Sequence, residues 1–145
     1  MSDYDDMIAR ADAEQADGRF KEASIDYGRA LAIGGPQDRY CRHMRGVCAR
    51  RVGLQRLDKA DRHPEQRSSF LDQAARWLTK SEANLDSALE GAEDGERGRI
   101  RLEQALTEES LARYLEMSGG DSRRRVSEAE RHRHEATALS GRPPR

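Results

Sequence analysis

The feature that most constrains this fold is a run of small and apolar residues at helical spacing. Between residues 64 and 92 they recur at steps of three or four positions, which places them on one stripe of a single long helix. The stripe consists of Leu71, Ala74, Leu78, Ser81, Leu85, Ala88 and Ala92. Because several of its members are small, the stripe predicts close packing against another helix.

Composition extends this prediction to the whole chain. The 145 residues include 19 alanines, whereas aromatic residues make up only 5%. Charged residues make up 37%, but the net charge is only -1 and the apolar residues keep a helical period, unlike those of a disordered polyampholyte. We expect one all-α domain over residues 1–140 and a disordered tail over residues 141–145, which hold two prolines.

Glycine and proline divide the chain into six helical segments. Gly18 can take the left-handed conformation that closes a helix, and Pro64 suits the first turn of one because its missing N–H would be unpaired there. Short connections force consecutive helices into antiparallel pairs, so six helices make three hairpins. The predicted helices cover residues 2–16, 20–33, 37–57, 64–92, 96–117 and 122–139.

The second segment carries a pattern of turn, aromatic and small residues. The pattern consists of Gly18, Phe20, Ala23, Tyr27, Ala30 and Pro36. It resembles the second half of a tetratricopeptide repeat, and Gly18 and Gly53 lie 35 residues apart, close to that family's period of about 34. The resemblance implies three antiparallel hairpins stacked as a right-handed α-α superhelix.

The rest of the chain departs from the family pattern. Met7 stands where tryptophan is usual in the first helix, and Glu14 where tyrosine is usual. The second unit keeps Gly46 and Gly53 at the family's internal spacing of seven, but its second helix is over-long. The third unit retains only two alanines of the pattern, so beyond the first hairpin the chain resembles the family only as helical hairpins.

In this family the first helix of each hairpin lines a concave groove in which peptides lie. The resemblance therefore implies a scaffold or adaptor that binds a partner protein or peptide, with no cofactor. Some members clamp a peptide's terminal carboxylate with lysine and asparagine in this groove, but neither residue type stands at the groove positions of this chain. The residues facing the groove would be Asp5, Ile8, Asp12, Gln15, Tyr40, His43, Val47, Arg50 and Arg51.

Net charge alternates along the chain, with -4 over residues 1–36, +5 over 37–63, -6 over 64–121 and +4 over 122–145. Such alternation can select a complementary protein or a second copy of this chain. It is equally typical of solvated helix faces that carry arginine–glutamate pairs. A homodimer is a further alternative, because the long fourth helix would leave leucine and alanine surface for a second copy to cover.

Arginines on the third helix raise the alternative of a nucleic-acid-associated regulatory protein, because basic clusters bind phosphates. The isoelectric point of about 6.4 argues against this alternative, as does the spread of these arginines around the helix. They are Arg39, Arg42, Arg45, Arg50, Arg51 and Arg56.

Residues typical of catalysis and metal binding are few. Cys41 and Cys48 lie on nearly one face of the same helix, where they could not easily bridge, so we expect buried free thiols. Together with His43 they match no established zinc spacing. His132 and His134 lie on different sides of their helix. Because no nucleotide loop or nucleophile motif is present either, we expect no metal site and no enzyme activity.

The only tryptophan, Trp77, lies one position off the apolar stripe of the fourth segment. We interpret it as a core residue at the edge of the stripe, with a partner anchor as the alternative. No stretch approaches the roughly 20 apolar residues of a membrane helix, and the first residues are acidic where a signal peptide would be basic. We therefore expect a cytoplasmic protein with no membrane partner.

Overall fold

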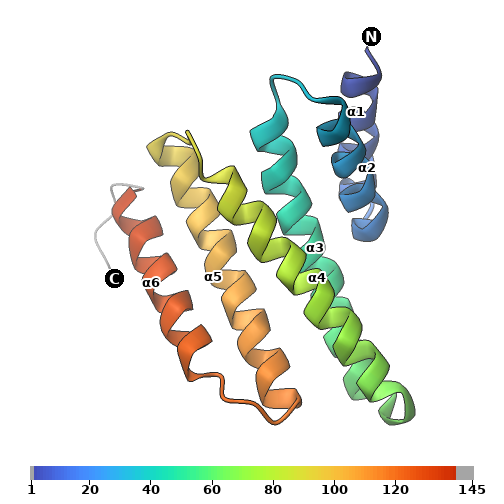
Figure 1. Cartoon of the computed structure of the whole chain (residues 1–145), viewed down its shortest axis with the longest axis vertical. Helices are drawn as coiled ribbons and strands as arrows, with labels where there is room; N and C mark the ends of the chain where they lie inside the picture. The colour runs from blue at the N-terminus through green and yellow to red at the C-terminus, as the bar shows by residue number, and fades with distance from the viewer. Residues whose placement is uncertain (1, 140–145) are drawn as a thin grey trace.

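The computed structural model describes residues 2–139, which form α-helices and one short 3-10 turn but no strand (Figure 1). The helices pack as consecutive pairs, and α1 and α6 lie at opposite ends of the row. The all-α prediction is therefore confirmed, whereas the predicted tail lies outside the described residues. The elements are α1 (Asp3–Ala16), α2 (Phe20–Ile33), α3 (Asp38–Arg62), η1 (Pro64–Gln66), α4 (Arg67–Ala88), α5 (Asp94–Met117) and α6 (Arg123–Leu139).

Three helix boundaries differ from the prediction by three residues or more. α3 continues past Leu57 because no glycine or proline interrupts the following polar stretch, within which Ala60 is buried. Pro64 then begins the 3-10 turn η1 instead of the α-helix itself. The C-terminal end of α4 is Ala88, and Gly91 in the connection that follows has a φ of 72°. None of the described helices combines the length and the apolar character needed to cross a membrane.

The α3–α4 interface is the most extensive in the described chain, and it depends on two glycines of α3. A Cβ atom at Gly46 would lie 2.8 Å from Leu85 Cγ, and one at Gly53 would lie 2.7 Å from Leu78 Cγ. Leu78 and Leu85 are themselves fully buried. The stripe predicted from the sequence is thus buried against α3 at a distance that leaves no room for a side chain opposite its leucines.

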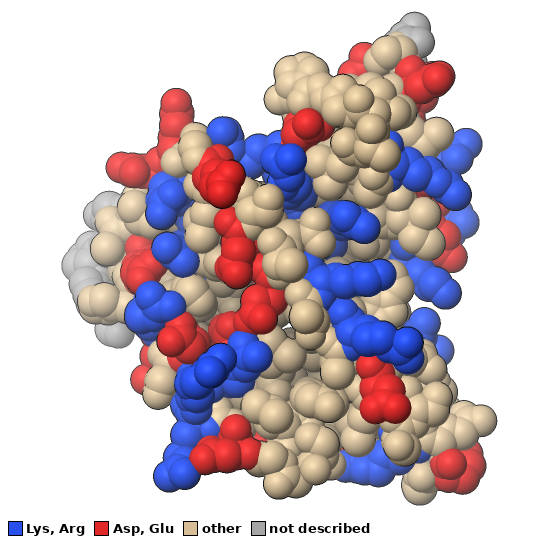
Figure 2. Space-filling view, viewed as in Figure 1, with Lys and Arg blue, Asp and Glu red and all other residues tan. Residues whose placement is uncertain are grey.

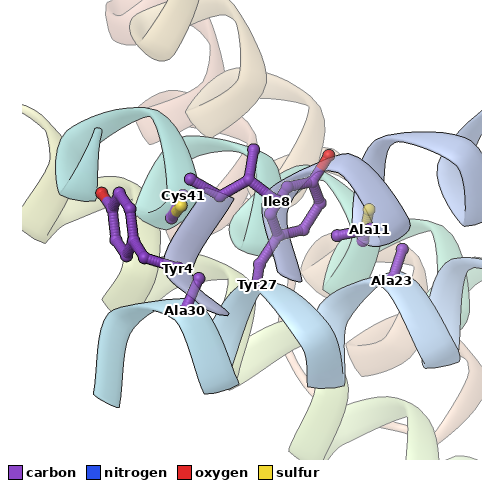
Figure 3. Packing of buried hydrophobic residues seen from close by; sticks show 8 residues of the cluster. Tyr4, Ile8, Ala11, Ala23, Tyr27, Ala30 and Cys41 are labelled. Carbon is purple, nitrogen blue, oxygen red and sulfur yellow. The ribbon is translucent and has the colours of Figure 1, made fainter. Parts of the chain in front are cut away.

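Buried apolar side chains form three separate clusters within the described residues. The first lies among α1, α2 and the start of α3, and Figure 3 shows Tyr27 lying across its centre. Ala23, Tyr27 and Ala30 are fully buried there, as their place in the repeat-like pattern predicts. Cys41 and Cys48 are free and buried in the same cluster. Burial raises the pKa of these two thiols to about 11 and about 12 respectively.

The connection "GGP" is fixed by Tyr4. Gly34 takes a φ of 84°, and a Cβ atom at Gly35 would lie only 2.6 Å from the Tyr4 ring. The Tyr4 hydroxyl donates to Asp38 Oδ1 at 3.0 Å and accepts from the backbone N–H of Gln37 at 2.7 Å. Gly35, the second glycine of this connection, is therefore required by the packing of α1 against the start of α3.

Candidate functional site

The predicted groove residues of α3 lie on two neighbouring stripes of the helix. Tyr40, Val47 and Arg51 share one stripe, on which Tyr40 and Arg51 are exposed and Val47 is half-buried. His43 and Arg50 share the other stripe, which faces α5, and each is only 8% exposed. The structure therefore places three of these five residues where a partner could touch them.

Two tyrosines and an aspartate join α1, α2 and α3 at one end of the first stripe. The buried Tyr27 hydroxyl lies within hydrogen-bonding distance of Asp12 Oδ1 and of Gln15 Oε1. The Tyr40 hydroxyl donates to the same Asp12 oxygen at 2.7 Å, and the two tyrosine rings pack edge to face with centroids 6.1 Å apart. Burial and the Asp12 carboxylate raise the pKa of Tyr40 to about 12, so both hydroxyls remain protonated donors.

The two ends of this surface carry opposite charges. Asp5 lies exposed in the first turn of α1, where its backbone N–H donates to the Ser2 hydroxyl that caps the helix. The Arg51 guanidinium lies over the Phe20 ring, 4.7 Å from its centroid, and remains exposed to solvent. Side chains of α1 and α3 thus offer an acidic end, an exposed aromatic ring and a basic end.

The remaining groove residues are engaged inside the protein. Ile8 is 5% exposed and lies in the first apolar cluster, as Figure 3 shows. Arg50 Nη2 lies 3.2 Å from Glu103 Oε2 of α5, which closes the space between α3 and α5. Burial lowers the pKa of His43, which lies on the same side. Ile8, His43 and Arg50 therefore lie beneath the surface that a partner would meet.

A buried acid, Glu14, lies on the other side of α1. Glu14 is 9% exposed, one of its oxygens accepts no hydrogen bond among the described residues, and Asp26 of α2 is also buried. Burial, followed by the neighbouring Asp26 carboxyl, raises the pKa of Glu14 to about 7. Sequence periodicity places Glu14 near the core side of α1, but it gives no measure of how closely Asp26 approaches from α2.

This pair makes the stability of the first hairpin pH-dependent. The pKa of Glu14 is raised on folding, so its stabilising contribution is present below the unfolded value of 4.5 and is lost as pH rises through about 7. Glu14→Gln should raise the free energy of unfolding by about 1 kcal/mol near pH 8 and leave it unchanged near pH 5. Urea unfolding of both proteins at both pH values measures this difference. An equal change at the two pH values would contradict the assignment.

Among the described residues, no three histidine, cysteine, aspartate or glutamate side chains are placed to hold one metal ion. Comparison of the whole chain with protein-family models, with curated proteins and with solved structures finds no match in any of the three.

Proposed function

We propose that this chain is a protein-binding scaffold whose three hairpins stack in the manner of tetratricopeptide repeats. Its partner-binding surface would consist of Asp5, Asp12, Tyr40, Val47 and Arg51. In support, each hairpin contacts the next in chain order, as in repeat proteins whose extended surfaces bind other proteins. The α3 residues of this surface also lie on one stripe of a first helix, which is where the family resemblance places a groove.

The observation that carries the proposal is the fixed but exposed ring of Tyr40. The ring is 37% exposed, while its hydroxyl is held by Asp12 and its edge packs against Tyr27. A tyrosine held in one orientation loses little conformational entropy when a partner covers it, and tyrosine and arginine are common binding hot spots. Arg51 lies on the same stripe, so a partner with an apolar residue followed by an acidic one would fit both.

Affinity capture from a lysate of the source organism tests this proposal. The wild-type chain and the variant Tyr40→Ala/Arg51→Glu would be immobilised, and the proteins retained by each would be identified by mass spectrometry. We expect a partner that binds the variant about tenfold more weakly than the wild type, measured with the purified partner. Arg50 is left intact because its replacement would leave Glu103 half-buried without a cation.

A matched control removes one exposed apolar residue and reverses one exposed arginine elsewhere. Leu102→Ala/Arg62→Glu makes these changes on α5 and at the end of α3, and it should retain the partner fully. Equal loss in both variants would show that general charge, and not the Tyr40 surface, drives retention. Capture of nothing but the chain itself would contradict a scaffold and support the homodimer.

A further inference from the structure

A basic cleft of about 320 Å³ lies on the opposite side of α3, between α2 and α4. Figure 2 shows lysine and arginine atoms gathered along this part of the surface. Three other clefts of the described chain each contain at least two carboxylates, whereas this one contains none. The residues that line the basic cleft are Lys21, Arg56, Gln73, Arg76, Trp77 and Lys80.

The cleft arises where stripes of three helices converge. Lys21 comes from α2 and Arg56 from α3, while Arg76, Trp77 and Lys80 share one side of α4. Four cations from three helices therefore face one space, although they lie up to 59 positions apart in the sequence. This convergence is absent from the sequence pattern, in which the basic residues of α3 simply spread around that helix.

Arg56 lies on a stripe of α3 whose members Ala49 and Val52 are fully buried. Arg45 continues this stripe about 16 Å along the helix from Arg56. Its guanidinium lies beside Gly28 of α2, where a Cβ atom would come within 3.2 Å. A glycine at position 28 thus leaves room for a further cation along the line of the cleft.

The four cations of the cleft lack carboxylate partners within the described part of the chain, although eleven other arginines there form ion pairs. Arg56 Nε is buried and has no hydrogen-bond partner among residues 2–139. The Lys80 ammonium lies 4.8 Å from the centroid of the Trp77 ring. Gathering unpaired cations in one cleft is electrostatically costly, and a bound anion would remove that cost.

From this convergence we infer that the basic cleft binds a phosphorylated segment of a partner protein. The inference rests on the proposed scaffold function and names the chemistry of a second contact. A phosphomonoester carries nearly two negative charges and three acceptor oxygens, which matches two guanidinium forks and two ammonium groups better than a single carboxylate does. Recognition of phosphorylated segments by clustered arginines is a general mode of peptide binding.

Two observations favour a phosphorylated protein over a nucleic acid as the occupant. Trp77 is the only aromatic residue of the cleft, and it is half-buried with the Lys80 ammonium over its ring. Single-stranded nucleic acids are commonly bound by stacking successive bases on exposed aromatic rings, which this cleft does not offer. The whole chain also carries a net charge of -1, which would weaken sequence-independent binding to a long polyanion.

Titration with labelled synthetic peptides tests the inference. The probe is a fluorescein-labelled glycine–serine peptide with two phosphoserines, followed by anisotropy. The comparison probes replace both phosphoserines by serine or by glutamate, and a thymidine oligonucleotide of equal charge serves as the nucleic acid. We expect saturable binding of the phosphopeptide, at least about tenfold tighter than that of any comparison probe. Because Trp77 is the only tryptophan, its emission should change over the same titration.

Variants with the same change of charge locate the site. Arg56→Gln/Arg76→Gln should weaken phosphopeptide binding about tenfold or more, and Lys21→Gln/Lys80→Gln does the same without touching the buried Arg56 nitrogen. The control Arg10→Gln/Arg62→Gln removes two exposed arginines outside the basic cleft and should leave the affinity unchanged. Tyr40→Ala should bind the probe with unchanged affinity. A wrong assignment of the Tyr40 surface can therefore be distinguished from a wrong assignment of this cleft.

Three results would overturn the inference. The first is no saturable binding of the phosphopeptide. The second is equal binding of the glutamate peptide, or tighter binding of the oligonucleotide, which would assign the basic cleft to another ligand. The third is equal weakening by the control pair Arg10→Gln/Arg62→Gln, which would show that overall charge alone attracts the probe.

Discussion

Gly46→Ala/Gly53→Ala should lower the free energy of unfolding by about 3 kcal/mol, although alanine is the better helix former. The new methyl groups would lie 2.8 and 2.7 Å from the Cγ atoms of Leu85 and Leu78, closer than real contacts allow. Both leucines are fully buried, so they cannot move aside without disturbing the α3–α4 interface. Chemical denaturation followed by circular dichroism measures the loss.

The chain contains a matched control for this double substitution. Gly95 and Gly98 lie in the first two turns of α5, where a Cβ atom would meet only atoms at 3.5 Å or more. Gly95→Ala/Gly98→Ala should therefore raise the free energy of unfolding by about 1 kcal/mol through helix propensity alone. If both double variants were more stable than the wild type, the close approach of α3 and α4 would not depend on glycine.

Arg125→Gln should be the most damaging single replacement of a charged residue on α6. Arg125 Nη1 lies 2.6 Å from Glu82 Oε2 of α4 and 3.1 Å from Glu108 Oε2 of α5, so one cation joins three helices. The Glu108 side chain is only 8% exposed. Removing the arginine leaves two neighbouring carboxylates without a cation, and we expect a loss of about 2 kcal/mol near pH 8.

The loss should depend on pH. Burial and the neighbouring Glu82 raise the pKa of Glu108 to about 7 even with Arg125 in place, and without the arginine it should rise further. Because this pKa is raised on folding, the stabilising contribution of Glu108 is present below the unfolded value of 4.5 and is lost as pH rises through about 7. The damage should thus shrink near pH 5, where Glu108 holds its proton.

An exposed ion pair between α5 and α6 provides the control for Arg125. Arg133 lies 2.6 Å from Glu109, but both side chains are 46% exposed. Arg133→Gln should therefore change the free energy of unfolding by less than about 0.5 kcal/mol at either pH. Thermal unfolding of both variants and the wild type at the two pH values completes the test. A pH-independent loss for Arg125→Gln would contradict the raised pKa of Glu108.

Much of the fold could be predicted because it follows from local patterns. The stripe from Leu71 to Ala88 and the small residues Ala23 and Ala30 mark buried helix faces by spacing alone. The ends of α1 and α2 were predicted well because Gly18 and Gly34 close these helices. The prediction is wrong after Leu57, because polar composition indicates a loop there although no glycine or proline breaks the helix.

The candidate surfaces were harder to predict because they depend on which helix faces which. Spacing along α3 places Tyr40 and Arg50 on neighbouring stripes of the helix, but only the position of α5 determines that Arg50 is buried against Glu103. Trp77 was interpreted as a core residue from its distance to the stripe, whereas it lies outside the three apolar clusters and lines the basic cleft. Neighbours from other helices leave no signal in a single sequence.

The division of the apolar interior into three clusters has a consequence for how the chain folds. Each cluster takes side chains from two neighbouring hairpins, so a hairpin buries its apolar surface fully only when its neighbour is in place. α3 contacts α2, α4 and α5, and so it touches a helix of every hairpin. Cooperative unfolding of the described residues therefore depends on α3, since loss of this one helix would separate the first hairpin from the rest.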